Sequence, residues 1–248
     1  LWTRSLDGPV QGAANAVGIG GEPHAVLVTQ QKGRLHCVRV ADGRSRWRTE
    51  PTERCDGSVA VSSNRVVFGN CTSTIFAFSA GDGEPAARFP LGPGHEIAAG
   101  VALDGAMAFS GNRRGSLVAV DLAAGNLVWK CERSREPLFT TPAIDERNVV
   151  FVSGDGEIVC AERASGRVVW GHKTDGYDAT SPVMTSDKVV AAVGGVLYVL
   201  DRKSGRLTWS LKIAERTTAP SLIGRGVAVG TSDGRLMFFK PETQGKRE

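Results

Sequence analysis

The chain contains no long hydrophobic run. No segment approaches the roughly 18 to 20 consecutive apolar residues that a membrane-spanning helix needs. At the N-terminus, which reads Leu1-Trp2, no positively charged region and apolar region precede a cleavage site, so no export signal is visible. We therefore expect no membrane span, and a soluble, cytoplasmic protein is favoured.

Charge of one sign is nowhere concentrated. The net charge is +4, and no five consecutive residues carry the same charge. A nucleic-acid-binding surface usually gathers Lys and Arg on one face with aromatic residues between them. This sequence predicts no nucleic-acid partner.

Cysteine and proline are scarce, whereas glycine is not. The five cysteines form no CxxC pair and their odd number argues against a full disulfide framework, so zinc-ribbon and thioredoxin-type motifs are excluded. The 31 glycines are spread along the chain and predict many tight turns joining short strands. No segment of 11 to 18 residues keeps a helical period, so an all-β chain is expected.

An internal repeat dominates the sequence. Four copies place a second glycine ten residues after a first and a tryptophan four residues later. The four glycine and tryptophan sets are Gly33, Gly43 and Trp47; Gly115, Gly125 and Trp129; Gly156, Gly166 and Trp170; and Gly195, Gly205 and Trp209. A fifth copy has Ser73 at the first glycine and Ala87 at the tryptophan, and we expect Phe89 to replace the indole. A sixth copy begins at Gly234.

The tryptophan positions are expected to dock successive blades of a propeller. They follow one another at 39 to 45 residues, and the distance from Trp209 through the C-terminus to Trp2 is 41 residues. A period of about 40 residues accommodates the four strands of one propeller blade. The expected structural set is Trp2, Trp47, Trp129, Trp170 and Trp209.

The resulting prediction is an all-β, six-bladed β-propeller of four-stranded antiparallel blades. Residues 1–248 form one domain, closed by Leu1–Leu6 as the strand that completes the last blade, because joining both ends in one blade removes free edges. The blades are expected near residues 12–50, 55–91, 96–133, 138–174, 178–213 and 216–240 plus 1–6.

The glycine and tryptophan pattern resembles the PQQ-like (quinoprotein-like) repeat family over the whole chain. That family includes quinoprotein dehydrogenases, outer-membrane assembly lipoproteins of the BamB type, and propellers fused to adenylating enzymes and bacterial kinases. The resemblance implies the fold and leaves the activity open, because one fold hosts many functions.

The repeat also sorts the cysteines. Cys37 and Cys160 share the repeat position of Ala77, Ala119 and Val199, so both are expected to be small buried packing residues. Cys55 and Cys71 lie symmetrically about a hairpin centred near Ser63, where facing residues could form a disulfide. The alternative is two reduced thiols near the blade rim.

Function is expected on the face that carries the loops between blades (D–A loops) and the turns between the second and third strands (B–C turns), because loops vary on a rigid frame. One sector of this face is basic, and the planar guanidinium group of arginine suits partners that present carboxylate or phosphate groups. Because Glu132 and Glu136 lie among these arginines, the alternative is an ordinary solvated surface. The candidate binding residues are Arg113, Arg114, Arg133, Arg135, Lys173, Asp178, Tyr177, His95 and His172. No metal site is expected, because the His, Cys and Asp residues of this face lack short ligand spacing.

We therefore predict a non-catalytic binding or scaffolding propeller with no cofactor. Its partner is expected to be a protein or an associated enzyme, or a small ligand at the channel mouth. The alternative is an enzyme with its site at the channel mouth. The quinoprotein dehydrogenases carry an adjacent Cys-Cys pair that is absent here, so PQQ is not expected. A third hypothesis is a cell-envelope scaffold of the BamB type. That family member has eight blades and needs an export signal, so the six predicted blades and the lack of a visible signal argue against a close functional match.

Overall fold

The computed structural model describes residues 1–19, 22–62 and 64–240, and these residues form six antiparallel sheets. The first three sheets consist of β1 (Asn15–Ile19), β2 (Glu22–Thr29), β3 (Leu35–Arg39) and β4 (Ser45–Arg48); β5 (Ala60–Ser62), β6 (Arg65–Asn70), β7 (Thr74–Ser79) and β8 (Pro85–Pro90); and β9 (Ala102–Asp104), β10 (Met107–Gly111), β11 (Ser116–Asp121) and β12 (Asn126–Glu132). The other three consist of β13 (Ala143–Ile144), β14 (Asn148–Val152), β15 (Ile158–Glu162) and β16 (Val168–His172); β17 (Val183–Met184), β18 (Lys188–Val193), β19 (Val196–Asp201) and β20 (Leu207–Lys212); and β21 (Ser221–Ile223), β22 (Gly226–Gly230) and β23 (Leu236–Phe239).

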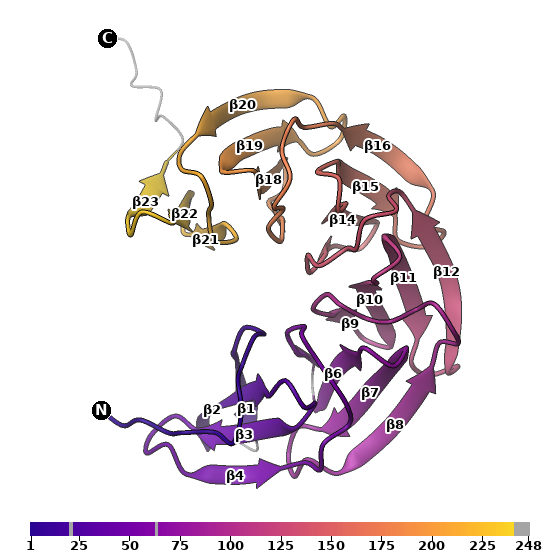
Figure 1. Ribbon diagram of the computed structural model, residues 1–248, viewed down its shortest axis with the longest axis vertical. Coiled ribbons are helices and arrows are strands. Elements are labelled where there is room, and N and C mark those ends of the chain that lie inside the picture. Colours follow the sequence, from indigo (N-terminus) through magenta and orange to yellow (C-terminus); the bar gives the residue numbers. More distant parts are fainter. Residues whose placement is uncertain (20–21, 63, 241–248) are drawn as a thin grey trace.

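Each sheet is a meander of hairpins, and the sheets follow one another around a common centre (Figure 1). The first strand of a sheet lies near the centre, and the fourth, such as β4, β8 or β12, lies at the outside (Figure 1). Such sheets arranged radially are the blades of a β-propeller. The predicted all-β, six-bladed fold is confirmed, with four strands in five blades and three strands among the described residues of the last.

The tryptophan of one blade packs on the second glycine of the next blade. A methyl group built on Gly83 would lie 2.5 Å from the Trp47 ring. Methyl groups built on Gly166 and Gly205 would lie 2.6 Å from the Trp129 ring and 2.5 Å from the Trp170 ring. These glycines also have positive φ, between 68° and 78°. Glycine is therefore required twice over, for the turn of its own blade and for the indole of its neighbour.

Phe89 replaces the missing tryptophan as expected. Its ring lies 3.8 Å from the position of a methyl group on Gly125, and the side chain is buried. A smaller ring leaves more room at this junction than an indole does.

The first glycine of each copy begins the third strand with positive φ. Gly115 has φ of 77°, and a methyl group there would lie 2.3 Å from the Ser134 carbonyl oxygen. Ser73 occupies the same repeat position with φ of 56°. A serine in the left-handed region carries a conformational cost that glycine avoids.

The hydrophobic core lies between adjacent blades. Phe68, Phe109 and Phe151 occur on the second strand of successive blades and are fully buried. The third strands supply Cys37 and Cys160, which face Trp47 and Trp170 across the ladder beside a β-bulge. Both cysteines are buried, so they are packing residues as the repeat predicted.

The predicted closing strand is not formed. Leu1–Leu6 contain no strand, and the last sheet has three strands, so these residues do not complete it. Trp2 nevertheless makes the docking contact predicted for it: it packs on Gly43, the second glycine of the first blade, with 2.5 Å between its ring and a methyl group built there, and its Nε1–H donates to the Val40 carbonyl at 2.7 Å. The contacts of the tryptophan, rather than edge pairing with β23, determine where this segment lies. Residues 241–248 of the predicted domain lie outside the described residues.

Candidate functional site: the loop face

The D–A loops and B–C turns interlock on one face of the propeller. The Thr52 hydroxyl donates to the Gly33 carbonyl at 3.1 Å, and the backbone N–H of Cys71 donates to the Arg54 carbonyl at 2.8 Å. One D–A loop thus holds the B–C turns of the first and second blades. These bonds make the face a rigid frame for side chains, as loop-borne sites require.

Two buried asparagines support the B–C turns from beneath. The Asn70 Oδ1 accepts the N–H of Thr74 at 3.2 Å, and the Asn112 Oδ1 accepts those of Arg114 at 3.0 Å and Ser116 at 2.9 Å. Both amides are fully buried. Their hydrogen bonds hold the turn that carries Arg113 and Arg114 in one conformation.

Arg113 is committed to partners within the molecule. Its Nη2 donates to Asp56 Oδ2 at 3.0 Å and to Cys71 Sγ at 3.7 Å. Its guanidinium also lies 5.9 Å from the centroid of the Phe139 ring. Phe139 is 57% exposed and was missed by sequence reasoning, although an aromatic residue in a D–A loop is a detectable signal.

Arg133 is likewise a structural residue. Its guanidinium forms hydrogen bonds of 2.7 Å and 2.8 Å to the two carboxylate oxygens of Glu157, whose side chain is only 5% exposed. Lys173, in the following D–A loop, pairs at 3.3 Å with Asp155, which lies in the same B–C turn as Glu157. Much of the basic sector predicted from the sequence is therefore neutralised by acidic residues of the B–C turns.

Arg114 and Arg135 remain exposed and without a carboxylate partner within 4.0 Å among the residues that the structure describes. The Arg114 guanidinium rests against Gly94, where a methyl group would lie 2.7 Å from its Cζ. Arg135 belongs to the same D–A loop as Phe139. These two arginines leave positive charge on the loop face.

Of the other candidate residues, only His95 lies beside the turn that carries Arg114. His95 Nδ1 lies 3.5 Å from the Asn112 amide, and His172 meets the edge of Tyr198 with 6.1 Å between ring centroids. Asp178 pairs with Arg216 at 3.3 Å at the following blade junction, where Tyr177 is exposed. The remaining candidates, His172, Lys173, Tyr177 and Asp178, thus lie at other blade junctions than Arg114 and His95.

Of the two alternatives for Cys55 and Cys71, the structure has the reduced one, and both are free thiols. The Cys55 Sγ lies 3.6 Å from the Gly57 carbonyl, and the Cys71 Sγ lies 3.7 Å from Asp56 Oδ2. The register of β5 and β6 pairs Ala60 with Val67 and begins only at Ala60, so Cys55 lies outside the ladder. The hairpin is centred one half-residue beyond the predicted centre, Ser63, which is outside the described residues.

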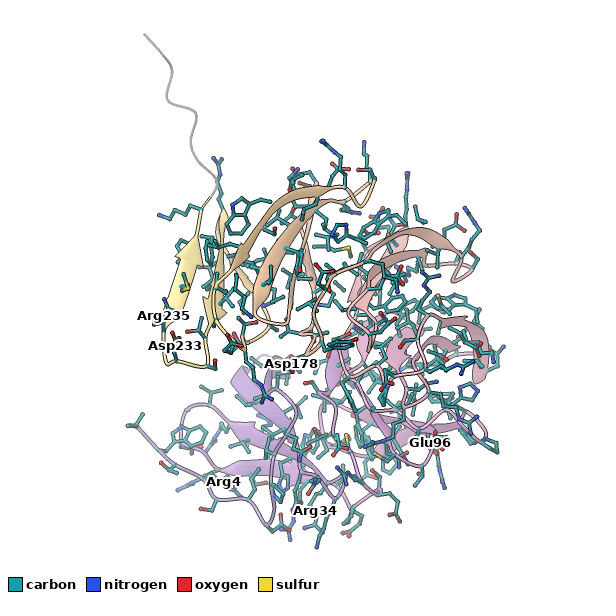
Figure 2. The ribbon with its side chains drawn as sticks, turned by 45° about the horizontal axis from the view of Figure 1, so that its top comes forward. Arg4, Arg34, Glu96, Asp178, Asp233 and Arg235 are labelled. Atoms are coloured by element: carbon teal, nitrogen blue, oxygen red, sulfur yellow. The ribbon has the colours of Figure 1, made fainter. Side chains whose placement is uncertain are left out.

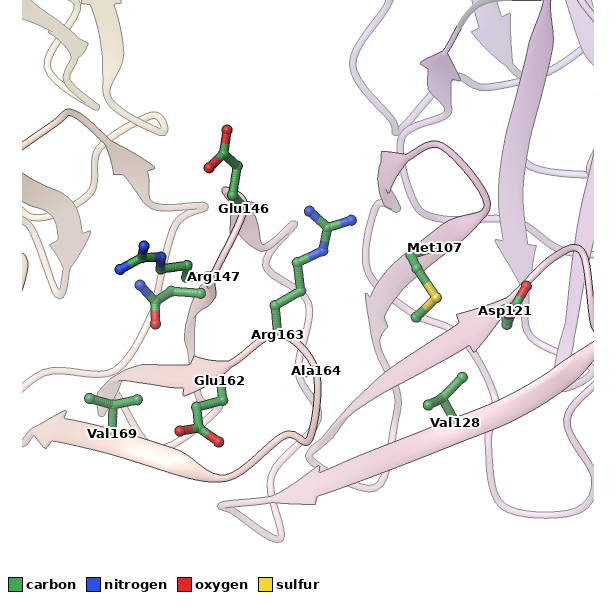
Figure 3. A pocket seen from close by; sticks show the side chains of 10 residues that line it. Met107, Asp121, Val128, Glu146, Arg147, Glu162, Arg163, Ala164 and Val169 are labelled. Carbon is green, nitrogen blue, oxygen red and sulfur yellow. The ribbon is translucent and has the colours of Figure 1, made fainter.

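A groove lies between the third and fourth blades on the face opposite to the loops. It has a volume of about 830 Å³ and is bounded by hairpin turns bearing Glu146, Arg147 and Arg163 (Figure 3). Val128 and Val169 of the outer strands β12 and β16 line it. Arg163 is held there by Asp104 at 2.7 Å.

Metal-ligating residues do not gather anywhere in the described ranges 1–19, 22–62 and 64–240: no three His, Cys, Asp or Glu side chains are placed to hold an ion. Within the same ranges no helix has the length and apolar character needed to cross a membrane.

Comparison with known proteins gives relatives along nearly the whole chain. The outer membrane protein assembly factor BamB of Bordetella pertussis is 27% identical over 260 residues, which cover 96% of this chain and 64% of the relative. The BamB proteins of Burkholderia pseudomallei and Shewanella oneidensis are 25% and 23% identical, and cover 92% and 94% of this chain. The chain spans less than two thirds of the length of these relatives, at 62% to 64%.

A solved structure has the same fold. The crystal structure of BamB from Moraxella catarrhalis matches 99% of this chain and 74% of its own chain, with a TM-score of 0.77 and 19% identity. Because this chain spans only part of its relatives, a difference in blade number does not argue against relationship.

The expected cytoplasmic location is wrong. The relatives are named for assembly of outer membrane proteins. The sequence indicated a cytoplasmic protein only through the lack of an export signal, which is weaker support than similarity along the chain. The prediction that PQQ is not a cofactor agrees with relatives that are named assembly factors.

The family model described as outer membrane protein assembly factor BamB matches residues 1–86 and 72–247. These two matches together cover almost every residue and both halves of the propeller. The chain therefore belongs to the BamB family of PQQ-like repeat propellers.

Proposed function

We propose that this propeller is a non-catalytic scaffold that binds a protein partner during outer membrane protein assembly. The observation that carries the proposal is the pair of exposed guanidinium groups without a carboxylate partner, Arg114 and Arg135, in a sector where Arg113 and Arg133 are ion-paired and Phe139 is exposed. Family membership supports the assembly role, because the relatives are named for it.

The chemistry of this surface suits a protein partner. Arginine and aromatic residues are enriched where protein interfaces concentrate their binding energy. A hydrogen bond from the Arg114 backbone N–H to Asn112 fixes the backbone of the turn, so the turn loses little conformational freedom when a partner binds. We infer that the partner presents carboxylates next to an apolar side chain.

The alternative of an enzyme gains no support from this face. The ionisable candidates occupy separate blade junctions and are mostly engaged in pairs such as Arg133 with Glu157. Acid–base catalysis requires groups that converge within hydrogen-bonding reach of one reacting atom.

The test is an affinity capture from envelope extract of the native source, followed by mass spectrometry. The double variant Arg114→Glu/Arg135→Glu is compared with the wild type and with Arg147→Glu/Arg206→Glu, which changes net charge equally on exposed turns of the opposite face. Wild type and control should retain outer membrane assembly proteins that the loop-face variant loses. Equal retention by all three proteins would remove this sector from the proposal.

A further inference from the structure

The outer strands of the first two blades carry arginines and no acidic residue. β4 reads Ser-Arg-Trp-Arg and β8 reads Pro-Ala-Ala-Arg-Phe-Pro, so Arg46, Arg48 and Arg88 are the charged residues of these strands, and all three are exposed. Both strands lie at the outside of the arc (Figure 1). The basic rim, defined as Arg46, Arg48 and Arg88, thus lies on the outer edge of the propeller.

The positive charge of the basic rim is not neutralised. Among residues 1–19, 22–62 and 64–240, no carboxylate lies within 4.0 Å of any of its three guanidinium groups. Glu50, which follows β4, lies 3.9 Å from Arg34 instead, and Glu84, which precedes β8, is exposed. By contrast, Arg235 of the last blade pairs with Asp233 at 2.7 Å (Figure 2).

The repeat shows that the blade does not require an arginine before the docking position. The residue equivalent to Arg46 is Ala86, Val128, Val169 or Thr208 in the other blades. Val128 and Val169 are each 46% exposed, although their blades have neighbours on both sides (Figure 1). Exposure of this position is therefore a property of the repeat, and an arginine there adds charge at a position that packing leaves in solvent.

The next position along the outer strand confines the free charge to the first two blades. Arg48 and Arg88 are equivalent in the repeat, and the third blade has Lys130 there, which pairs with Glu132 at 2.7 Å. The fourth and fifth blades have uncharged residues at this position. Free positive charge therefore accumulates on two adjacent outer strands.

The basic rim lacks the apolar anchors of a protein interface. None of the exposed large hydrophobic side chains in the described part of the chain belongs to β4 or β8. Protein interfaces concentrate their binding energy in aromatic and apolar side chains, and charged residues on an edge strand hinder addition of a strand from another protein. Guanidinium groups bind phosphate through parallel hydrogen bonds. These features favour a partner that presents phosphate groups on a surface.

We propose that the basic rim binds the anionic headgroups of a phospholipid surface. Arginines near such a surface are attracted by its negative potential, and lipids that move laterally can meet three charges without a fixed arrangement of partner groups. This inference goes beyond the proposed function, because the basic rim and the loop-face pair Arg114 and Arg135 belong to different blades and can be changed separately.

The test is sedimentation of the purified protein with vesicles of phosphatidylcholine and phosphatidylglycerol, and with vesicles of phosphatidylcholine alone. The wild type should sediment with the anionic vesicles only, and added salt should weaken this binding because ions screen the attraction. Arg46→Glu/Arg88→Glu should lower the partition coefficient by at least about tenfold, since two attractive charges are replaced by two repulsive ones.

Two further variants separate the position of the charge from net charge and from folding. Arg147→Glu/Arg206→Glu changes the net charge equally on turns away from the basic rim and should retain vesicle binding. Arg46→Lys/Arg88→Lys keeps the charge and should retain most of it. Thermal unfolding checks that each variant is folded, because the Arg88 guanidinium also lies 5.6 Å from the centroid of the Phe76 ring.

Absence of wild-type binding to the anionic vesicles would overturn the proposal. So would an equal loss in Arg46→Glu/Arg88→Glu and Arg147→Glu/Arg206→Glu, or no loss in the first. Equal or tighter binding to immobilised polyglutamate would overturn the choice of a lipid and assign an acidic protein instead. The loop-face variant Arg114→Glu/Arg135→Glu should bind vesicles as the wild type does, so failure of vesicle binding and failure of protein capture are separate results.

Discussion

Trp170 and Trp209 occupy the same repeat position but differ in what covers them. Trp170 is 9% exposed and donates from Nε1 to the Arg202 carbonyl at 2.9 Å, whereas Trp209 is 40% exposed and contacts Phe239 with 5.6 Å between ring centroids. We expect Trp170→Ala to lower the free energy of unfolding by about 3–5 kcal/mol. Trp209→Ala should cost less than half as much. Denaturant unfolding of both variants checks this, and equal losses would contradict the docking role of Trp170.

Ser73 marks a residue where the chain departs from its own repeat. Ser73→Gly should raise the free energy of unfolding by about 0.5–1 kcal/mol, because glycine adopts the observed φ of 56° without strain. The matched change Gly115→Ala should destabilise, since its methyl group would meet the Ser134 carbonyl oxygen at 2.3 Å.

Gly92→Ala provides the control for this pair in the same unfolding measurement. Gly92 has φ of 82° but no neighbouring atom within 4 Å of an added methyl group, so it isolates the cost of backbone conformation. Gly115→Ala should lose more stability than Gly92→Ala. If the two losses are the same, close approach plays no part at the first glycine.

The cysteines differ in accessibility and in pKa. Burial raises the pKa of Cys55 to about 12 and those of Cys37 and Cys160 to about 11, while Cys71 is half-buried on the loop face. Because the thiolate is the reactive form, one thiol should react quickly with a maleimide in native protein at pH 8. Cys71→Ser should abolish that fast reaction, and unfolding the wild type should expose all five thiols. Only three reactive thiols after unfolding without reductant would instead indicate a bond between Cys55 and Cys71.

At the scale of elements, one ion pair joins the end of β12 to the B–C turn of the next blade. Arg133→Ala leaves the Glu157 carboxylate buried without its partner, so we expect a loss of about 2–3 kcal/mol in unfolding free energy. Arg135→Ala, in the same loop, should change stability by less than about 0.5 kcal/mol. Thermal unfolding of both variants distinguishes the two roles.

The double variant Arg133→Ala/Glu157→Gln tests the reason for that loss. Removing the buried charge should restore part of the stability, because an uncharged amide costs less to bury than a carboxylate. No recovery in the double variant would mean that packing of the long arginine side chain, rather than the buried charge, accounts for the effect.

At the scale of the whole molecule, six blades form an arc with the first and last sheets at its ends (Figure 1). Repeat spacing predicted that Leu1–Leu6 would join those ends, since the period through both termini matches the others. Spacing constrains positions along the chain and not hydrogen-bond partners in space. Trp2 docks on the first blade as the spacing predicted, but Leu1–Leu6 form no strand that pairs with β23.

On the loop face, too, the sequence predicted part of the arrangement and the tertiary structure decided the rest. Repeat position predicted which residues reach it, including Arg113, Arg114, Arg133 and Arg135. It did not predict that Asp56 and Glu157, from turns far along the chain, would neutralise Arg113 and Arg133. That Arg114 and Arg135 stay unpaired therefore became visible only in three dimensions, whereas Phe139 was detectable from its place in a D–A loop.

The sequence by itself determined the blade number, the order of strands and the docking tryptophans. Strict spacing of glycine and tryptophan leaves few other ways to bury the indoles of Trp47, Trp129 and Trp170, because each packs on a glycine of the next blade. The tertiary structure alone decided that Leu1–Leu6 form no strand with β23, that Cys55 and Cys71 are free thiols, and which arginines of the loop face stay unpaired. These depend on contacts between residues distant in sequence, where small differences in register and burial select one partner over another.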